Sequence, residues 1–417
     1  MLKRVVLLSL FLFIPTIAAA ESSAPHEIRI GTLYAGSGAF ASSSIPQYQG
    51  LRFWVRRVNA RGGVFVKAYG RRIPVKLIAY NDQSQTGLAG SLYTQLITRD
   101  RVRILVADFG SVLTSVAIPL AEERQILLID PTGTSAKFFR GNNRFLILTG
   151  LPSSGIWPTV LADFLIAHKI GRVAIIYSAN DFTESQDQTL VSRIEAAGIH
   201  PVYNHAVANS TSSYTLLLHQ AVARRAQALI ELGYNNNDIA LLQDLSAGGM
   251  HFAMVFTINP GLRVPLFLKA VGAQALGGTF TYVTPPSLAY NKVNYGLGLA
   301  AFKQAFEPWN RKHGNVPLGL SVIAGYNSGL IIQKALETAK RYDSVALRTA
   351  IRAVSGRLFT LDGLFKVDSR GNQIGEPIPL GQFFMSQEKL VLKVVYPAKV
   401  ATAKPLYPAP RWGSGRG

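Results

Sequence analysis

The chain contains no cysteine. This absence excludes disulfide bonds, thiolate nucleophiles, cysteine metal sites and a lipidated N-terminal cysteine. Acidic residues are also scarce, because 23 Asp and Glu stand against 43 Lys and Arg and leave a formal net charge of +20. The 417 residues are 48% hydrophobic and only 16% charged. Since single hydrophobic cores stop growing at about 250–300 residues, we expect two lobes.

Signatures of catalysis are missing as well. The sequence has no Gly-x4-Gly-Lys-Ser/Thr phosphate loop, no His-Glu-x-x-His and no Gly-x-Ser-x-Gly. The seven histidines show no metal-ligand spacing with carboxylates. We therefore expect no metal, no cofactor and no enzyme activity, and a secreted α/β enzyme stays open only as an alternative.

One segment resembles a dinucleotide fingerprint, Gly36-Ser37-Gly38-Ala39-Phe40-Ala41. That fingerprint requires a helix that starts in the glycine loop and an acidic residue about 20 positions later. We expect residues 41–46 to delay the helix, and the next strand ends too late, at Asn81-Asp82. The segment is better explained as a tight turn that faces a ligand, which makes Ser42 and Ser43 further candidates for the site.

The N-terminus has the pattern of a secretory signal peptide. Lys3 and Arg4 precede a short apolar run, and Ala18-Ala19-Ala20 resembles a cleavage site. A membrane anchor would need about 20 apolar residues, and Pro15 interrupts this run. We expect export to the periplasm with residues 1–20 removed near Ala20. The basic residues are scattered, so we expect no nucleic-acid partner.

Strand-like and helix-like segments alternate along the chain, which predicts an α/β fold with two doubly wound lobes and parallel sheets. In the first half we expect strands at 28–33, 73–80, 103–107 and 126–129, and helices at 47–59, 86–99 and 114–123. The pattern restarts at Pro152 with helices at 158–168, 184–197, 213–224 and 237–247, and strands at 173–177, 201–207, 228–232 and 252–256. Two long helices, 292–312 and 319–340, and short strands within 359–395 follow. Residues 397–417 are expected to be a disordered tail.

Polar residues follow two neighbouring strands of the first lobe. Ser111 and Thr114 open a helix after the strand that ends at Ala107, and Thr132, Gly133 and Thr134 follow the strand that ends at Ile129. Ligands of open parallel sheets bind beyond the carboxyl ends of the strands. Helix N–H groups and hydroxyls there can receive a carboxylate without a cation. The alternative is that these residues are only helix caps.

In this order, the motifs resemble the branched-chain amino-acid type of ABC-transporter solute-binding proteins, which have the type I periplasmic binding fold. The motifs are Ile28-Arg29-Ile30-Gly31, Gly36-Ser37-Gly38, Gln49-Gly50, Asn59-Ala60-Arg61-Gly62-Gly63-Val64, Asn81-Asp82-Gln83-Ser84, Gly110-Ser111, Ala117-Ile118-Pro119 and Asp130-Pro131-Thr132-Gly133-Thr134-Ser135. The resemblance implies one lobe of 26–148 plus 284–354 and another of 149–283 plus 355–396. Three hinge crossings join them, near Thr149, Thr284 and Ser355.

The resemblance also implies the function. Such a protein, expected to be a monomer, captures a small molecule between its lobes and delivers it to an ABC permease and ATPase complex; a sensor of the same fold is the alternative. By resemblance, Ser111, Thr132 and Thr134 hold the ligand carboxylate, and Phe182 and Tyr234 form aromatic walls. Further candidates are Phe109, Gly110, Asp181 and Thr257.

The sequence departs from the family at the acid that takes the ligand ammonium. This acid is expected just after the strand that ends near Phe256, where the chain has Thr257-Ile258-Asn259-Pro260. A buried ammonium without a partner costs several kcal/mol. Unless Asp181 or Asp238 substitutes, aromatic or aliphatic carboxylates, amides and urea are the stronger candidates.

Overall fold

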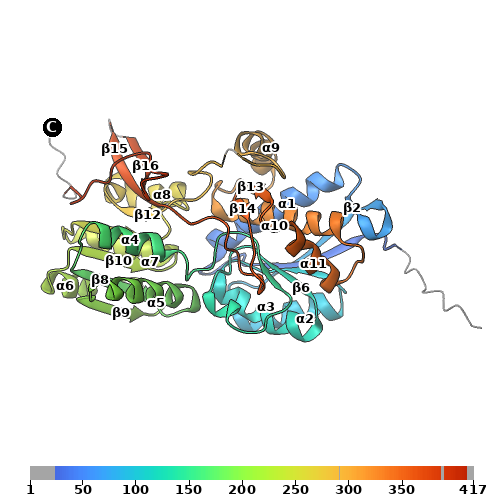
Figure 1. The fold of residues 1–417 in the computed structure, drawn as a ribbon, viewed down its shortest axis with the longest axis horizontal. Helices are drawn as coiled ribbons and strands as arrows, with labels where there is room; N and C mark the ends of the chain where they lie inside the picture. The colour runs from blue at the N-terminus through green and yellow to red at the C-terminus, as the bar shows by residue number, and fades with distance from the viewer. Residues whose placement is uncertain (1–23, 291, 387–388, 411–417) are drawn as a thin grey trace, which may run out of the picture.

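The computed structural model describes residues 24–290, 292–386 and 389–410. It has two lobes side by side, each built on one sheet with helices on both faces (Figure 1). The first sheet has the order β4-β1-β5-β6-β7 and is parallel throughout. Its strands are β1 (Ile28–Tyr34), β4 (Val75–Asn81), β5 (Ile104–Val106), β6 (Leu127–Asp130) and β7 (Leu146–Leu148). β5, β6 and β7 are buried at every position, as expected for strands covered on both faces.

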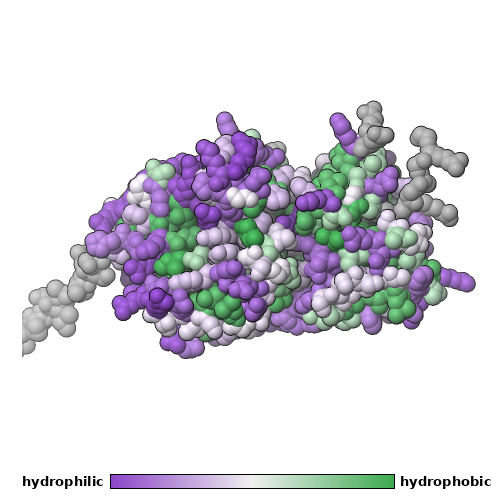
Figure 2. All heavy atoms as spheres, turned by 180° about the vertical axis from the view of Figure 1, so that it is seen from behind, coloured by the Kyte–Doolittle hydropathy of each residue, from purple (hydrophilic) through white to green (hydrophobic). Residues whose placement is uncertain are grey.

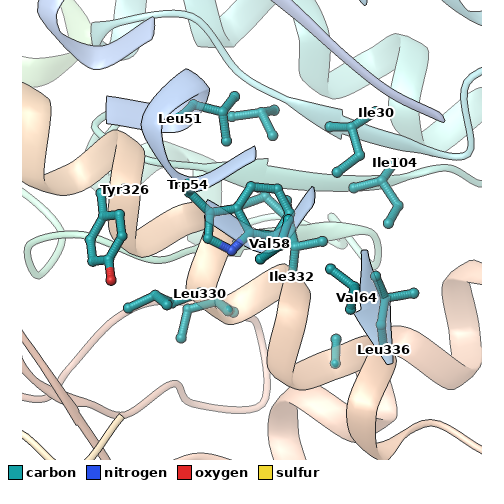
Figure 3. Packing of buried hydrophobic residues seen from close by; sticks show 14 of the residues in the cluster. Ile30, Leu51, Trp54, Val58, Val64, Ile104, Tyr326, Leu330, Ile332 and Leu336 are labelled. Carbon is teal, nitrogen blue, oxygen red and sulfur yellow. The ribbon is translucent and has the colours of Figure 1, made fainter. Parts of the chain in front are cut away.

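Helices cover the two faces of the first sheet with separate apolar clusters. α1 (Ala41–Asn59), α10 (Leu320–Thr338), α11 (Ser344–Val354) and α9 (Leu299–Lys312) pack in one cluster, and α2 (Thr86–Thr98) and α3 (Gly110–Arg124) pack in the other. α1 and α10 approach each other closely at Gly50, where a Cβ atom would overlap the Val322 carbonyl group. The glycine therefore allows this contact between the two helices. Figure 3 shows the same cluster around Trp54 and Tyr326. This packing fixes the start of α1, which lies at the contact between the lobes.

The second sheet has the order β16-β15-β12-β11-β10-β8-β9. Five parallel strands, β8 (Val173–Ser178), β9 (Tyr203–Val207), β10 (Ala228–Leu232), β11 (Met254–Thr257) and β12 (Phe280–Tyr282), are extended by the antiparallel β15 (Leu380–Ser386) and β16 (Lys389–Tyr396). The helices of this lobe are α4 (Pro158–Ala167), α5 (Asp181–Ala196), α6 (Thr215–Ala223), α7 (Asn235–Ala247) and α8 (Val264–Leu276). The predicted α/β class with two doubly wound lobes is thus confirmed.

The chain crosses between the lobes three times in the described residues. The first crossing follows β7 and the second follows β12, close to the predicted Thr149 and Thr284. The third differs from the prediction near Ser355. β13 (Leu358–Thr360) and β14 (Gly363–Phe365) stay in the first-lobe core, and the Leu148 N–H donates to the Gly371 carbonyl oxygen at 2.9 Å. The third crossing therefore lies between Gly371 and β15. The β13–β14 hairpin stays with the first lobe because it packs in the core of that lobe, and the local sequence pattern does not record this long-range contact.

Three further expectations need correction. α1 begins at Ala41, so residues 41–46 do not delay the helix, although the acidic residue of a dinucleotide site is still missing. α8 and α11 were not predicted, although Asp343 caps α11 by accepting from the Ala346 N–H at 2.8 Å. The disordered tail is wrong for 397–410, because the Leu406 N–H donates to Gln382 Oε1 at 2.8 Å and so ties the segment to β15.

The predicted signal peptide, 1–20, and the last part of the predicted tail, 411–417, lie outside the described residues. Within the part of the chain that the structure describes, no helix is both long and apolar enough to cross a membrane.

Candidate functional site

A pocket with about 410 Å³ of space, partly open to solvent, lies between the two lobes. It opens beyond the carboxyl ends of β5 and β6 in the first lobe and of β8, β10 and β11 in the second, where parallel sheets bind ligands. Most of the lining is apolar or aromatic. The lining residues are Phe109, Gly110, Pro131, Thr132, Thr134, Leu151, Trp157, Phe182, Tyr234, Asn259 and Leu320.

Two threonines of the first-lobe wall differ in their hydrogen bonding. Thr132 Oγ1 donates to Gln47 Oε1 at 2.6 Å and accepts from the Gly110 N–H at 3.1 Å, so the fold already uses this hydroxyl. Thr134 Oγ1 is buried and has no hydrogen-bond partner among the described residues. A buried polar group without a partner costs about 1–3 kcal/mol. The Thr134 hydroxyl is therefore the group of this wall that would gain most from a ligand oxygen.

Ser111, Thr114 and Gly133 lie behind this wall and do not line the pocket. Ser111 Oγ accepts from the Ser135 N–H at 3.0 Å, and its own proton remains free to donate. Thr114 is fully buried, with Oγ1 3.4 Å from Asp130 Oδ1. A Cβ on Gly133 would overlap both Thr114 and Asp130, which explains the glycine.

Asp130 shapes the loop that carries the threonines. Its Oδ1 accepts from the N–H groups of Thr132 at 3.1 Å and Gly133 at 2.6 Å, and the loop turns tightly after β6. Burial raises the pKa of Asp130 to about 7, although these two N–H groups oppose the rise.

Aromatic rings from the second lobe form the opposite wall. Phe182 packs edge-on against Trp157, with ring centroids 5.3 Å apart, and lies 5.5 Å from the Tyr234 ring. Asn180 positions Phe182, because its Oδ1 caps α5 by accepting from the Phe182 N–H at 3.0 Å. Phe40 of the first lobe meets Tyr234 edge-on at 5.3 Å. Phe40 therefore contacts the aromatic wall from the first lobe, although it does not itself line the pocket.

The Tyr234 hydroxyl points to the start of α3. It is buried without a hydrogen bond that meets ordinary geometry among the described residues. Burial raises its pKa, and the backbone N–H groups of Val112 and Ser111 oppose that rise. A phenol of the second lobe thus lies beside the first-turn N–H groups of a first-lobe helix, which is the side of the pocket that attracts anions.

Asn259 lines the pocket and was missed as a site residue. Its backbone N–H donates to Asp238 Oδ2 at 2.6 Å, and its Nδ2 donates to the same oxygen at 2.9 Å and to the Gly233 carbonyl oxygen at 3.0 Å. These acceptors fix the orientation of the amide and leave Asn259 Oδ1 as the group that can face a ligand. Its position directly after β11 is the signal in the sequence, although the family resemblance implies a carboxylate there.

The two acids considered as substitutes for the ammonium site lie elsewhere. Asp238 is buried behind Asn259, and burial raises its pKa to about 6. Burial and the adjacent Asp238 raise the pKa of Glu231 well above its ordinary value. Asp181 is 40% exposed and pairs with Lys137 of the first lobe at 2.6 Å. Neither Asp238 nor Asp181 lines the pocket.

The remaining sequence candidates fall into two groups. Phe109 and Gly110 line the pocket, whereas Thr257 is fully buried in β11 and does not. Ser42 and Ser43 contact the second lobe and not the pocket: Asn235 Nδ2 donates to Ser43 Oγ at 3.0 Å and lies 3.4 Å from Ser42 Oγ. Among the described residues, no group of three or more His, Asp or Glu could hold a metal ion.

Known proteins resemble this chain in sequence and in fold. Residues 27–386 match the family model described as periplasmic binding protein. A Leu/Ile/Val-binding protein homolog 7 of Brucella abortus is 22% identical over 352 residues, which cover 82% of this chain and 85% of the relative.

Solved structures share the fold. A leucine binding protein of Thermotoga maritima superposes with a TM-score of 0.73 at 15% identity, over 88% of this chain and 98% of that one. A branched-chain amino acid transporter substrate binding protein of Streptococcus pneumoniae, in complex with isoleucine, superposes with a TM-score of 0.72 at 18% identity, over 89% of this chain and 100% of that one. An ABC transporter solute binding protein of R. palustris, in complex with benzoate, superposes with a TM-score of 0.70 at 16% identity, over 92% of this chain and 97% of that one. These likenesses match the type I periplasmic binding fold.

Proposed function

Because the chain belongs to the periplasmic binding protein family, we propose that it captures a small carboxylate with an apolar or aromatic body and delivers it to an ABC importer. The family consists of extracytoplasmic substrate-binding proteins and not of enzymes. The ligand class, the partner complex and a monomeric state are our proposals. Closure of the lobes around the ligand would be the signal that the permease reads.

The observation that carries the proposal is the contrast between the two walls of the pocket. The first-lobe wall has the unpartnered Thr134 hydroxyl and lies at the N-terminus of α3, where Ser111 and Val112 turn their N–H groups toward the Tyr234 hydroxyl. The partial positive charge of a helix N-terminus favours an anion. The aromatic rings of Trp157 and Phe182 offer an apolar surface opposite. A carboxylate with an apolar or aromatic body satisfies both walls.

The same contrast argues against an α-amino acid. Asn259 presents a neutral oxygen where an ammonium would need a carboxylate, and Asp238 is occupied in holding that amide. A buried ammonium paired only with neutral acceptors is costly. Structures of similar fold contain leucine, isoleucine or benzoate, so fold likeness alone does not choose between these ligands. A neutral amide ligand is the second choice, because Asn259 Oδ1 can accept from its N–H.

A thermal-shift screen of the chain starting at Glu21 tests this assignment. The ligands are benzoate, short aliphatic carboxylates, amides, urea and the branched-chain amino acids. A ligand at 100 times its dissociation constant stabilises the folded state by about 2.7 kcal/mol. We expect a rise with carboxylates, followed by saturable binding in calorimetry. A rise with leucine and none with any carboxylate would contradict the proposal.

We also propose that the mature protein is periplasmic and starts at Glu21. Mass spectrometry of the protein recovered from the periplasmic fraction of the native cells tests this directly. The expected mass lacks residues 1–20, and a full-length mass in the membrane fraction would contradict it.

A further inference from the structure

The positive charge of the chain is concentrated in the first lobe, and the proposed function does not use it. Residues 24–148 contain 16 basic residues (Lys and Arg) and 7 acidic residues (Asp and Glu), and residues 299–375 contain 11 basic and 5 acidic residues. Residues 149–283, which form most of the second lobe, contain 7 basic and 8 acidic residues. Asp82, Asp108 and Asp130 of the first lobe are buried, so they add little negative charge to its surface. Figure 2 shows hydrophilic side chains gathered over this half of the molecule.

The topology of the first sheet brings basic residues to one edge. All five strands are parallel, so their amino ends meet at the edge opposite the ligand pocket. Every strand of this sheet has a basic residue within three positions of its start, namely Arg29, Lys76, Arg103, Arg124 and Arg144. Glu27 neutralises part of this edge, because it lies 2.8 Å from Arg29 and 3.4 Å from Lys76.

A groove with about 840 Å³ of space, open to solvent, lies at the unneutralised part of this edge. It runs between the segments that enter β5 and β6 and the turn that opens α11. Its lining residues are Ile97, Arg101, Val102, Arg103, Arg124, Gln125, Ile126, Tyr342, Asp343, Ser344 and Leu347. Three arginines from two separate segments therefore share one concave surface.

These arginines are mostly unpaired. In the described ranges, the guanidinium groups of Arg101 and Arg103 make no hydrogen bond or ion pair, and Arg124 pairs only with the exposed Glu123 at 3.1 Å. Asp343 supplies the one carboxylate of the lining, and it already accepts from Arg341 Nε at 3.0 Å and from the Ala346 N–H of α11 at 2.8 Å. The groove therefore keeps an excess of positive charge that no protein group neutralises.

Two hydroxyl groups of the lining can also donate. Tyr342 Oη is buried and has no hydrogen-bond partner in the described part of the chain. Ser344 Oγ accepts from the Leu127 N–H at 3.1 Å, which leaves its proton free. Guanidinium forks match the oxygens of phosphate bidentately, and neutral hydroxyls complete such a shell. The donor set is thus suited to an anionic phosphate group with several oxygens.

We propose that this groove is a second binding site, specific for a phosphate group, at the end of the first lobe remote from the ligand pocket. The phosphate group could be carried by a soluble pyrophosphate-type anion or by a lipid headgroup, because both present non-bridging phosphate oxygens that arginines can bind. The site does not depend on the ligand assigned to the pocket.

The experiment compares the wild type with Arg101→Ala/Arg103→Ala. Both side chains are exposed, so folding should persist, which circular dichroism checks. The matched control is Arg311→Ala/Lys312→Ala, which removes the same charge from exposed positions on α9 of the same lobe. The probes are inorganic pyrophosphate in calorimetry, and phosphatidylcholine vesicles with and without phosphatidylglycerol in cosedimentation, all at physiological ionic strength.

Saturable binding of pyrophosphate by the wild type, weakened about ten-fold or more in Arg101→Ala/Arg103→Ala and unchanged in the control, is the expected result. If phosphatidylglycerol vesicles also bind, and pyrophosphate displaces them, the source is a lipid headgroup; if only pyrophosphate binds, it is a soluble anion. If neither pyrophosphate nor the vesicles bind saturably, or if both double variants lose binding equally, the proposed site is overturned. Ligand binding in the pocket should be unchanged in both variants, so failure here leaves the proposed function untouched.

Discussion

The guanidinium group of Arg263, in the second lobe, donates a hydrogen bond to the carbonyl oxygen of Ser42, in the first. That oxygen would normally accept from the N–H four residues later in α1, but this residue is Pro46, which has none. Arg263 also donates to Ser43 Oγ, which Asn235 reaches as well. The proline inside α1 thus leaves a free acceptor that Arg263 of the second lobe uses.

Arg263→Ala should shift the protein toward the open state. Arg263 is only 9% exposed, burial lowers its pKa to about 10, and no carboxylate pairs with it in the described residues. Removing it leaves the Ser42 carbonyl and the Ser43 hydroxyl without their strongest donor, at about 1–3 kcal/mol. We expect ligand affinity to fall about ten-fold and the radius of gyration in small-angle scattering to increase.

The control for this variant is Arg172→Ala, because in the described part of the chain the Arg172 side chain donates only to carbonyl groups of its own lobe, at Arg224 and Arg225. Tighter binding in Arg263→Ala would mean that the cost of burying the cation exceeds the value of its hydrogen bonds.

Thr134→Val tests the unpartnered hydroxyl in the pocket. Valine keeps the shape of the side chain and removes an oxygen that has no partner in the described part of the chain. Loss of a hydrogen bond to a charged ligand costs about 1.5–3 kcal/mol, so affinity should fall roughly 10- to 100-fold. Thermal stability without ligand should stay the same or rise, because a buried unsatisfied group is gone.

Thr279→Val is the matched control for this substitution. Thr279 Oγ1 is also buried and unpartnered, but the residue does not line the pocket. Stability should respond as in Thr134→Val, while calorimetry should give unchanged affinity. Equal affinities for wild type and Thr134→Val would remove this residue from the site.

Asn259→Asp introduces a carboxyl group beside Asp238, whose Oδ2 lies 2.9 Å from Asn259 Nδ2. Burial and the neighbouring negative charge raise the pKa of such a carboxyl group above its ordinary value. The charged form repels a carboxylate ligand, whereas the protonated form does not. We expect affinity for the carboxylate to be weaker than in the wild type at about pH 8 and to recover toward pH 5. Calorimetry at both values measures this.

Asn259→Ala separates the charge from the loss of the amide, because it removes the same hydrogen bonds without adding a titratable group. Its affinity should lack the strong recovery at low pH. A variant Asn259→Asp that binds leucine better than the wild type at neutral pH would support the argument that the missing acid decides the ligand.

Local patterns predicted the parts of the fold that depend on local interactions. The apolar runs of β5 and β6 mark buried strands, and parallel strands place their carboxyl ends together, so the sequence pattern predicts that Thr132 and Thr134 lie at this edge of the sheet. The pattern of hydroxyls also gave the first-lobe wall, although it could not separate Thr134, which lines the pocket, from Thr114, which lies behind it.

Interactions between distant residues explain what the sequence did not reveal. Asn259 is fixed by Asp238, 21 positions earlier, and Arg263 meets Ser43, 220 positions earlier. The hairpin after Ser355 stays with the first lobe because Leu358 and Phe365 pack in its core. No local periodicity records such partners, since the same short strands could extend either sheet.

A buried acid of the first lobe should make stability depend on pH. Asp362 is fully enclosed, and its one hydrogen-bond donor among the described residues is Asn327 Nδ2, 2.7 Å from Oδ2. Burial raises the pKa of Asp362 from 3.8 to about 7. Between these values the folded state holds a proton that the unfolded state releases, so the contribution of Asp362 to the free energy of unfolding is greatest below about pH 4 and is lost as the pH rises to 7.

In Asp362→Asn the free energy of unfolding, from urea titrations at about pH 5 and pH 8, should therefore fall less between the two pH values than in the wild type. Asp163→Asn, at an exposed acid paired with Arg193, should keep the wild-type slope. The same slope in all three proteins would mean that Asp362 is ionised in the folded state at neutral pH, contrary to its burial.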